Sequence, residues 1–352
     1  MHLDLMKKAV IGSVVFSIAA LGTILHLSAG KVITISDVAQ DEVQRTTSHV
    51  EESEEADPQV LTFEIGESNT SYLRIPLPEE CKAEDIIIEN HYMDQELCVL
   101  ISNVENDFYE ENVISGNRNM IEHGRYEAIK DGIKLRFQLT GIFEYRTILE
   151  NNDLYISFLS PREMYDRIVV IDPACGGQNT GYEAEGLLEK DINLLIAQKL
   201  KEKLDRTDIK VYYTRMDDVN PEEEARVKLA NETRADMYIQ IHVDSSEDSS
   251  IYGTTTMYNG DYFIPGFGSV ELADVLEREV VTSIKGKALG LSEAQAQEYT
   301  LRHITIPAAT VKAGYITNKQ EAILLGREEY CEKIATGIYN AIMNVYDELL
   351  VR

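Results

Sequence analysis

The chain has 352 residues, with 33 Lys and Arg against 61 Asp and Glu, and its formal net charge is −28 at pH 7. This length suits two domains, and 44% hydrophobic residues supply enough apolar material for packed cores, which excludes global disorder. The acidic balance leaves no basic stripe for phosphates and excludes nucleic acid as a partner. Four scattered cysteines without a CxxC pair exclude a disulfide scaffold and a structural zinc knuckle.

An uncharged, largely apolar stretch at residues 9–30 follows two lysines near the N-terminus. A stretch of 22 residues is long enough to span a hydrocarbon core of ~30 Å. The lysines place residues 1–8 in the cytoplasm, so we expect 9–30 to be a transmembrane signal anchor. The protein would then be a single-pass bacterial membrane protein whose bulk is extracytoplasmic. Alternatively, the LSA sequence at 27–29 is a signal-peptide cleavage site and the protein is secreted.

The next two parts of the chain differ in pattern. Residues 31–58 are polar and acidic without periodicity, which predicts an extended linker. Residues 59–160 contain runs of alternating or β-branched residues, which predict a small antiparallel sandwich or sheet. The runs are LTFEI (61–65), SYLRIPL (71–77), DIIIENHYM (85–93), ELCVLISNV (96–104), GIKLRFQLTG (132–141) and DLYISFLS (153–160). The stretch 105–130 is less regular. We expect a targeting or spacer module without a catalytic cluster.

From residue 166 to 352 expected strands and helices alternate. The expected strands are 168–172, 208–215, 236–242 and 307–318. The expected helices are 189–204, 221–234, 269–284 with Ser269 as N-cap, and 328–350. This alternation predicts a layered α/β domain with a mostly parallel twisted sheet and flanking helices.

Four side chains of different chemistry fall near the ends of these strands. Cys175, His242 and Lys312 each lie at or just past the carboxyl end of an expected strand. Glu189 opens the helix that follows a Gly-rich turn at 173–181. Because ligands of open α/β sheets bind at that edge, we expect a thiol, a carboxylate, an imidazole and an amine to converge there.

Several long segments of this half resemble a known family. IDPACGGQNTGYEAEGLLEKDINLLIAQKL, YYTRMDD, ARVKLANETRADMYIQIHVDSS and LRHITIPAATVKAGYITNKQEAILL occur in this order over about 166–350. Together they resemble the zinc-dependent N-acetylmuramoyl-L-alanine amidases of bacterial cell-wall remodelling. The resemblance implies hydrolysis of the amide between the muramic-acid lactyl group and L-Ala of the stem peptide. It places the zinc ligands at Cys175, Glu189 and His242, and the general base at Lys312.

Two of these four positions depart from the family pattern, since a His is expected at Cys175 and a Glu at Lys312. A thiolate is a legitimate zinc ligand, although Cys175 is as readily explained as a small thiol filling a loop. The change at Lys312 is more severe, because a protonated amine cannot accept a proton and a general base contributes ~10²–10⁴ in rate. We expect Lys312 to form an ion pair with Glu189, leaving zinc absent or weakly bound. In the opposing hypothesis a neighbouring metal keeps Lys312 neutral, so that it acts as the base.

The sequence leaves three functions open. The first is a catalytically degenerate family member that binds peptidoglycan or a wall-remodelling partner without cutting the amide. The second is an active zinc hydrolase with a Cys/Glu/His ligand set, and Lys312 is the residue that separates these two. The third is a structural or regulatory interaction protein without a ligand. The β-rich module resembles the wall-targeting domains that often precede such amidases, by analogy only.

Overall fold

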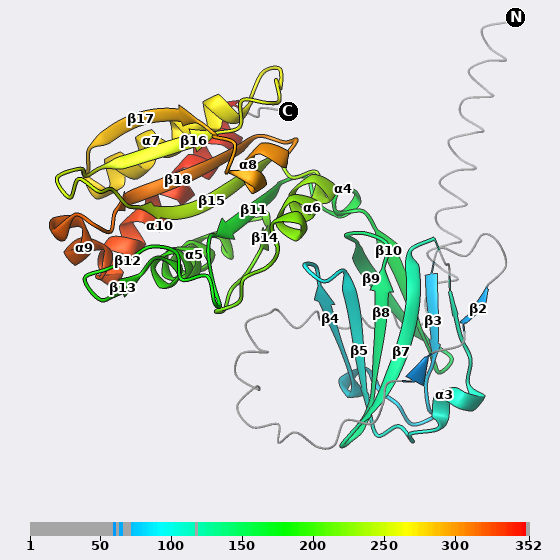
Figure 1. The fold of residues 1–352 in the computed structure, drawn as a ribbon. Coiled ribbons are helices and arrows are strands. Elements are labelled where there is room, and N and C mark those ends of the chain that lie inside the picture. Colours follow the sequence, from blue (N-terminus) through cyan, green and yellow to red (C-terminus); the bar gives the residue numbers. More distant parts are fainter. Residues whose placement is uncertain (1–58, 61–62, 66–71, 117–118, 350–352) are drawn as a thin grey trace, which may run out of the picture. The chain divides into compact units, whose positions relative to one another are not determined.

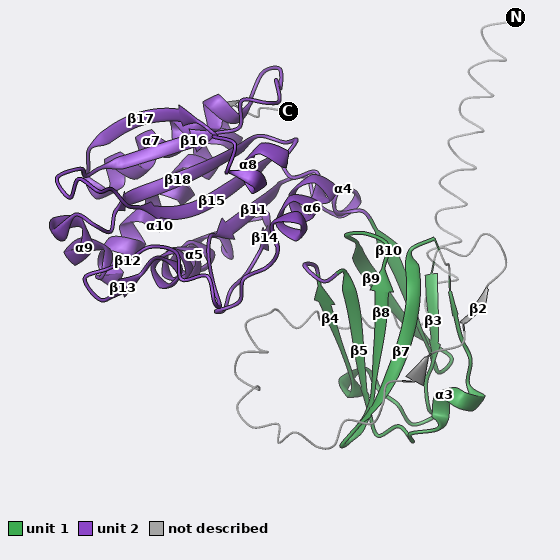
Figure 2. Cartoon of the chain, viewed as in Figure 1, with its two compact units in different colours: residues 1–91, 95–159 green, residues 92–94, 160–352 purple. Residues whose placement is uncertain are grey.

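The computed structural model describes residues 59–60, 63–65, 72–116 and 119–349. The chain divides into two compact units, one formed by 1–91 with 95–159 and the other by 92–94 with 160–352 (Figure 2). The expected anchor at 9–30 and the linker at 31–58 lie outside the described residues. Among the helices that the structure describes, none is both long and apolar enough to cross a bilayer.

The first unit contains two five-stranded sheets (Figure 1). The sheet of order β1-β7-β8-β5-β4 is antiparallel and consists of β1 (Gln59–Val60), β4 (Ile86–His91), β5 (Glu96–Ser102), β7 (Ile121–Ile129) and β8 (Gly132–Leu139). The sheet of order β2-β6-β3-β10-β9 consists of β2 (Phe63–Ile65), β3 (Tyr72–Pro76), β6 (Ile114–Gly116), β9 (Glu144–Glu150) and β10 (Asp153–Leu159). Two short helices, η1 (Ala83–Asp85) and α3 (Phe108–Glu111), complete the unit.

Both sheets contribute to one hydrophobic core. In β8, for example, Ile133, Leu135 and Phe137 are buried while the residues between them are partly exposed. This period-two alternation is the pattern read from the sequence. The stretch 105–130, expected to be less regular, nevertheless contains β7, a nine-residue strand. Its sequence IEHGRYEAI carries few apolar residues, and its pairing with β8 stabilises it as a strand.

The second unit contains a six-stranded sheet of order β14-β11-β15-β18-β16-β17. Its strands are β11 (Ile168–Pro173), β14 (Lys210–Tyr213), β15 (Met237–Asp244), β16 (Thr254–Tyr258), β17 (Ala288–Glu293) and β18 (Ala308–Tyr315). Neighbouring strands are parallel except β16 and β18, which pair antiparallel. The expectation of a mostly parallel sheet is therefore confirmed, although the antiparallel pair of β16 and β18 makes the sheet a mixed one. Two strands were not expected from the sequence: β16, which is short and rich in Thr, and β17, which is short and contains a glycine.

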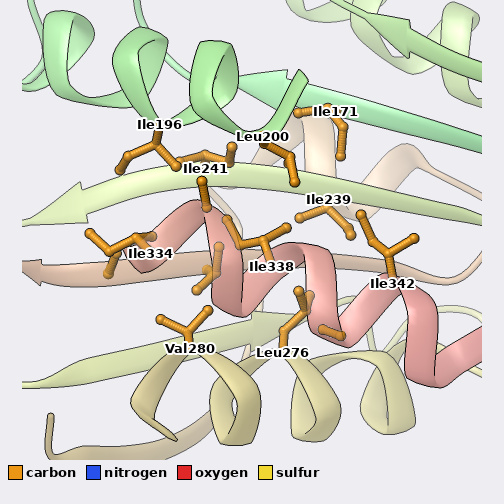
Figure 3. Close-up of a cluster of buried hydrophobic side chains, with 14 of the residues drawn as sticks. Ile171, Ile196, Leu200, Ile239, Ile241, Leu276, Val280, Ile334, Ile338 and Ile342 are labelled. Carbon is orange, nitrogen blue, oxygen red and sulfur yellow. The ribbon is translucent and has the colours of Figure 1, made fainter. Parts of the chain in front are cut away.

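Three helices cover one face of this sheet: α5 (Glu189–Leu204), α7 (Ser269–Ile284) and α10 (Glu328–Asn344). The apolar side chains of these helices meet those of β11 and β15 in one core (Figure 3). The bounds of α5 and α7 are those expected from the sequence. The expected cap was wrong by one residue, because Gly268 is the N-cap and the Ser269 hydroxyl instead accepts the Ala308 N–H at 3.1 Å. After α10 the chain forms a π-helical turn, Val345–Leu349.

The opposite face of the sheet carries polar side chains. Over it lie α6 (Glu223–Thr233) and α8 (Tyr299–His303), whose residues Glu223 and Thr300 are in contact at 3.5 Å. The remaining elements are α4 (Pro161–Met164), α9 (Lys319–Leu325) and the small hairpin β12 (Glu183–Ala184) and β13 (Leu187–Leu188). The candidate site lies on this polar face.

Candidate functional site

The structure brings together three of the four residues singled out in the sequence. Cys175 lies in the loop after β11, Glu189 is the first residue of α5, and His242 lies in β15. One donor atom from each lies within 4.8 Å of the other two. His242 and Lys312 are in register on neighbouring strands. Both lie inside their strands rather than at the ends as expected, because β15 and β18 each continue beyond them.

Glu189 is the buried centre of this cluster. Its Oε1 lies 2.6 Å from Nδ1 of His242, and its Oε2 accepts the backbone N–H of Tyr182 at 2.9 Å. Burial opposes ionisation, yet the hydrogen bond and charge of His242 hold the pKa of the Glu189 carboxyl below its usual value. The carboxylate is therefore ionised and fixed in orientation at neutral pH.

The loop that carries Cys175 is held by backbone contacts. Cys175 itself has a φ of 65°, and Gly176 and Asn179 exchange two hydrogen bonds of 2.8 and 2.9 Å. The buried guanidinium of Arg215 donates to the carbonyls of Pro173 and Ala174 at 2.8 and 3.0 Å. These contacts place the thiol before any ligand binds, which lowers the entropic cost of binding one.

The donor set fits a zinc ion. Thiolate, carboxylate and imidazole are zinc ligands, and bonds of ~2.0–2.3 Å in a tetrahedron hold ligand atoms about 3.3–3.8 Å apart. Donors within 4.8 Å of one another reach that arrangement by small rotations of the side chains. Burial and the Glu189 carboxylate raise the pKa of Cys175 to about 12, so without a cation the thiol keeps its proton.

Lys312 contacts a different carboxylate from the one expected. Its Nζ lies 3.3 Å from Oδ2 of Asp244, and both side chains are largely shielded from solvent. The expected ion pair of Lys312 with Glu189 is therefore wrong, since Glu189 pairs with His242. Asp244 lies two residues after His242 in β15, so both side chains are on the same face of the sheet.

A fully buried ion pair lies in the same polar face. The Asp172 carboxylate contacts the guanidinium of Arg226 and the hydroxyl of Tyr238, and it accepts a hydrogen bond from Gln240 at 2.8 Å. Burial opposes its ionisation, but the Arg226 charge and the hydrogen bonds from Thr214, Tyr238 and Gln240 together offset this and lower the pKa of Asp172. Arg226 thus braces this face of the fold through a buried carboxylate.

A cavity of about 350 Å³ opens beside the cluster. Its lining consists of Ala174, Cys175, Asn179, Asn220, Pro221, Glu222, Glu223, Arg226, Gln240, His242, Glu298, Tyr299, Thr300 and Leu301. Carboxylates and amides dominate this lining, and they accept hydrogen bonds from hydroxyl and N–H groups. The cavity therefore suits a polar ligand that contacts Cys175 and His242.

Gly181 closely covers the cluster. A methyl group on it would lie 2.5 Å from Oε2 of Glu189 and 2.8 Å from Sγ of Cys175. Gly181→Ala should therefore lower the free energy of unfolding by about 1–3 kcal/mol through steric overlap, beyond the ~1–2 kcal/mol cost of a positive φ. Gly186→Ala is the control, because Gly186 also has a positive φ (77°) but no neighbour within 4 Å among the residues that the structure describes. Equal losses in urea titrations of the two variants would contradict this close contact.

A second cluster of possible metal ligands, not expected from the sequence, lies in the first unit. In the first unit, donor atoms of His91, Glu96 and Cys98 lie within 4.8 Å of one another. The pairing of β4 with β5 could have predicted this cluster, because it places His91 opposite Glu96 and Glu89 opposite Cys98. Here the Glu96 carboxylate is bound by Nε of Arg136 at 3.0 Å.

Known proteins resemble the second unit. The model of the N-acetylmuramoyl-L-alanine amidase family Amidase_3 matches residues 169–344. YqiI of Bacillus subtilis, an uncharacterised protein, is 34% identical over 52% of this chain and 86% of its own length. The germination-specific N-acetylmuramoyl-L-alanine amidase of the same bacterium is 28% identical over 59% of this chain and 90% of its own. The structure of an N-acetylmuramoyl-L-alanine amidase from Clostridium difficile 630 is 31% identical over 52% of this chain and 97% of its own, with a TM-score of 0.48. The chain belongs to the N-acetylmuramoyl-L-alanine amidase family.

Proposed function

We propose that this family member binds peptidoglycan in the cavity beside Cys175 and His242 without cutting the amide between the muramic-acid lactyl group and L-Ala. The observation that carries the proposal is the ion pair of Lys312 with Asp244 at 3.3 Å. Lys312 stands where the family resemblance places the general base, and an ammonium has no lone pair with which to take a proton from water. The carboxylate of Asp244 stabilises the charged form of Lys312 in the site.

The lining of the cavity supports the binding part of this proposal. The cavity offers Glu222, Glu223 and Glu298 as acceptors for sugar hydroxyls and peptide N–H groups. Tyr299, whose ring stacks on His303 at 4.0 Å between centroids, adds a flat surface for a sugar ring. A glycopeptide can therefore be held while the proton transfer needed for hydrolysis is missing.

Zinc fits Cys175, Glu189 and His242, and when bound there it would polarise a substrate carbonyl as a Lewis acid. The thiolate would contribute one more negative charge than a histidine, which weakens the ion as an acid toward its ligands. Polarisation alone would orient a bound amide. It would not replace the general base, because the ammonium at position 312 cannot accept a proton from water.

We also propose an extracytoplasmic location for both units. The apolar segment 9–30, preceded by two lysines, supports a membrane anchor, and the acidic linker 31–58 supports a tether toward the wall. A wall-remodelling protein is the alternative partner to peptidoglycan itself.

Co-sedimentation of the full-length protein with purified peptidoglycan sacculi tests the proposal. We expect the unmodified protein to sediment with sacculi and to release no muropeptide in the presence of added zinc. Tyr299→Ala should weaken sedimentation about tenfold (~1.4 kcal/mol). Tyr252→Ala is the matched control, because this exposed tyrosine lies outside the cavity lining and should have no effect.

The remaining outcomes separate the alternatives. Release of muropeptides by the unmodified protein would overturn the proposal in favour of an active zinc hydrolase. That second candidate is supported by one observation, the convergence of a complete set of three zinc donors. Failure to sediment together with absence of release would overturn both, in favour of an interaction protein without a ligand.

A further inference from the structure

We propose that Cys175 binds a divalent cation as a thiolate, together with Glu189 and His242, and that the site therefore prefers thiophilic ions such as Cd²⁺ and Zn²⁺ to hard ions. This inference does not depend on whether the domain cuts peptidoglycan or only binds it. Cys175 stands where the family resemblance places a histidine, and its sulfur would change which metal ions the site prefers.

Separate parts of the fold hold the three donors in place. Cys175 is fixed by the bonded loop at Gly176 and Asn179, while Glu189 is held by the Tyr182 N–H and by His242. The cavity reaches Cys175 and His242, so an ion has a path to the site. Donors that are already close and accessible bind a cation with little reorganisation.

The charges around the three donors also favour a bound dication. A dication bound by the Cys175 thiolate and the Glu189 carboxylate is neutralised by its own ligands. The Lys312 ammonium is balanced separately by Asp244, at 3.3 Å. The Lys312 ammonium was expected to pair with Glu189 and so to take the place of zinc. Because it pairs with Asp244 instead, a metal-free site is no longer expected.

The chemistry of the three donors determines which ions bind preferentially. Thiolates favour soft and borderline ions, whereas Mg²⁺ and Mn²⁺ prefer oxygen ligands. A family site with two histidines lacks this selection. The sulfur of Cys175 should therefore raise the ratio of the Cd²⁺ affinity to the Zn²⁺ affinity. Replacing Cys175 by histidine should lower this ratio again.

The second cysteine cluster, in the first unit, is an internal comparison. The Cys98 thiol lies 3.2 Å from Oε1 of Glu96, and the same oxygen accepts Nε–H of Arg136 at 3.0 Å. Arg125 lies 3.8 Å from the other carboxylate oxygen. Two guanidinium groups already neutralise this carboxylate and would repel a dication, so we expect Cys98 to bind no metal.

Titration of the full-length protein with Co²⁺, followed by absorption, tests the proposal. A cobalt–thiolate bond gives an intense near-ultraviolet charge-transfer band, which oxygen and nitrogen ligands do not give. We expect this band in the unmodified protein and in Cys98→Ser, and its loss in Cys175→Ser with the circular dichroism spectrum unchanged. Absence of the band from the unmodified protein, its persistence in Cys175→Ser or its loss in Cys98→Ser would each overturn the proposal.

Competition between Cd²⁺ and Zn²⁺ against a chromophoric chelator gives a second measurement that does not require loss of a ligand. In Cys175→His the ratio of the Cd²⁺ to the Zn²⁺ affinity should fall on the order of tenfold relative to the unmodified protein. An unchanged ratio would mean that the sulfur does not contact the ion and would also overturn the proposal. Neither measurement uses peptidoglycan, so a failure here is distinct from a failure of the proposed function.

Discussion

Replacing Lys312 by glutamate, together with Asp244→Asn, should raise muropeptide release from sacculi in the presence of zinc by roughly 10²–10⁴. The glutamate supplies the carboxylate that the family resemblance places at this position of β18, in register with His242. The second change is needed because Lys312 and Asp244 are in contact. Two carboxylates at that distance would repel each other, and one of them would take up a proton.

The matched control for this variant is Lys312→Gln with Asp244→Asn. Glutamine has the shape of glutamate and also removes the ammonium, but it cannot accept a proton from water. Chromatography of the soluble muropeptides should therefore show release by the glutamate variant and none by the glutamine variant. Equal release by both variants would mean that the unmodified protein is inactive because the Lys312 ammonium inhibits hydrolysis, and not because a general base is missing. No release by either, with Cys175→His included as a further background, would contradict the role given to position 312.

The second large effect concerns the stability of the amidase-family domain. Arg226→Met should lower its free energy of unfolding by about 3–5 kcal/mol, because it leaves the Asp172 carboxylate buried without its cation. Asp172→Asn combined with Arg226→Met should lose less, since it removes both charges. Urea titrations followed by circular dichroism report on this domain, because the long helices of the described residues belong to it. Arg278→Met is the control, because Arg278 forms an exposed pair with Asp274, worth ~0–1 kcal/mol.

The same pair predicts a dependence of stability on pH. The pKa of Asp172 is lower in the folded than in the unfolded chain, where it is about 3.9. The pair therefore stabilises the fold at neutral pH, and this contribution declines as the pH falls below about 4 toward the folded pKa. Arg226→Met should show a smaller decline in that range. An equal acid-induced loss of stability in the variant and the unmodified protein would show that the pair is not its source.

Local sequence patterns predicted the parts of the fold that depend on near neighbours. The helices α5 and α7 begin and end where their apolar periodicity does. The strands β16 and β17 were missed, because each is a strand through its pairing with a neighbour distant in sequence. The cap of α7 shows the same limit, since Ser269 reaches the N–H of Ala308 on another strand.

The candidate site was predictable to the same extent. The carboxyl-edge rule predicted that Cys175, Glu189 and His242 lie together, because alternating strands and helices indicate parallel strands whose carboxyl ends share one edge. The partner of Lys312 was missed because β15 was expected to end at His242. In the structure the strand continues to Asp244, and the two-residue period places that carboxylate on the face of Lys312.

Composition, order and spacing of the residues thus predict an acidic chain of two domains whose second half belongs to the N-acetylmuramoyl-L-alanine amidase family. They also put a thiol and an amine at two of the four positions that the family resemblance assigns to the zinc ligands and the general base. Only the folded chain decides that the amine pairs with Asp244 and leaves Cys175, Glu189 and His242 together. The reason is physical: a charged side chain pairs with whichever opposite charge shares its face of the sheet, and strand length and register determine which charge that is.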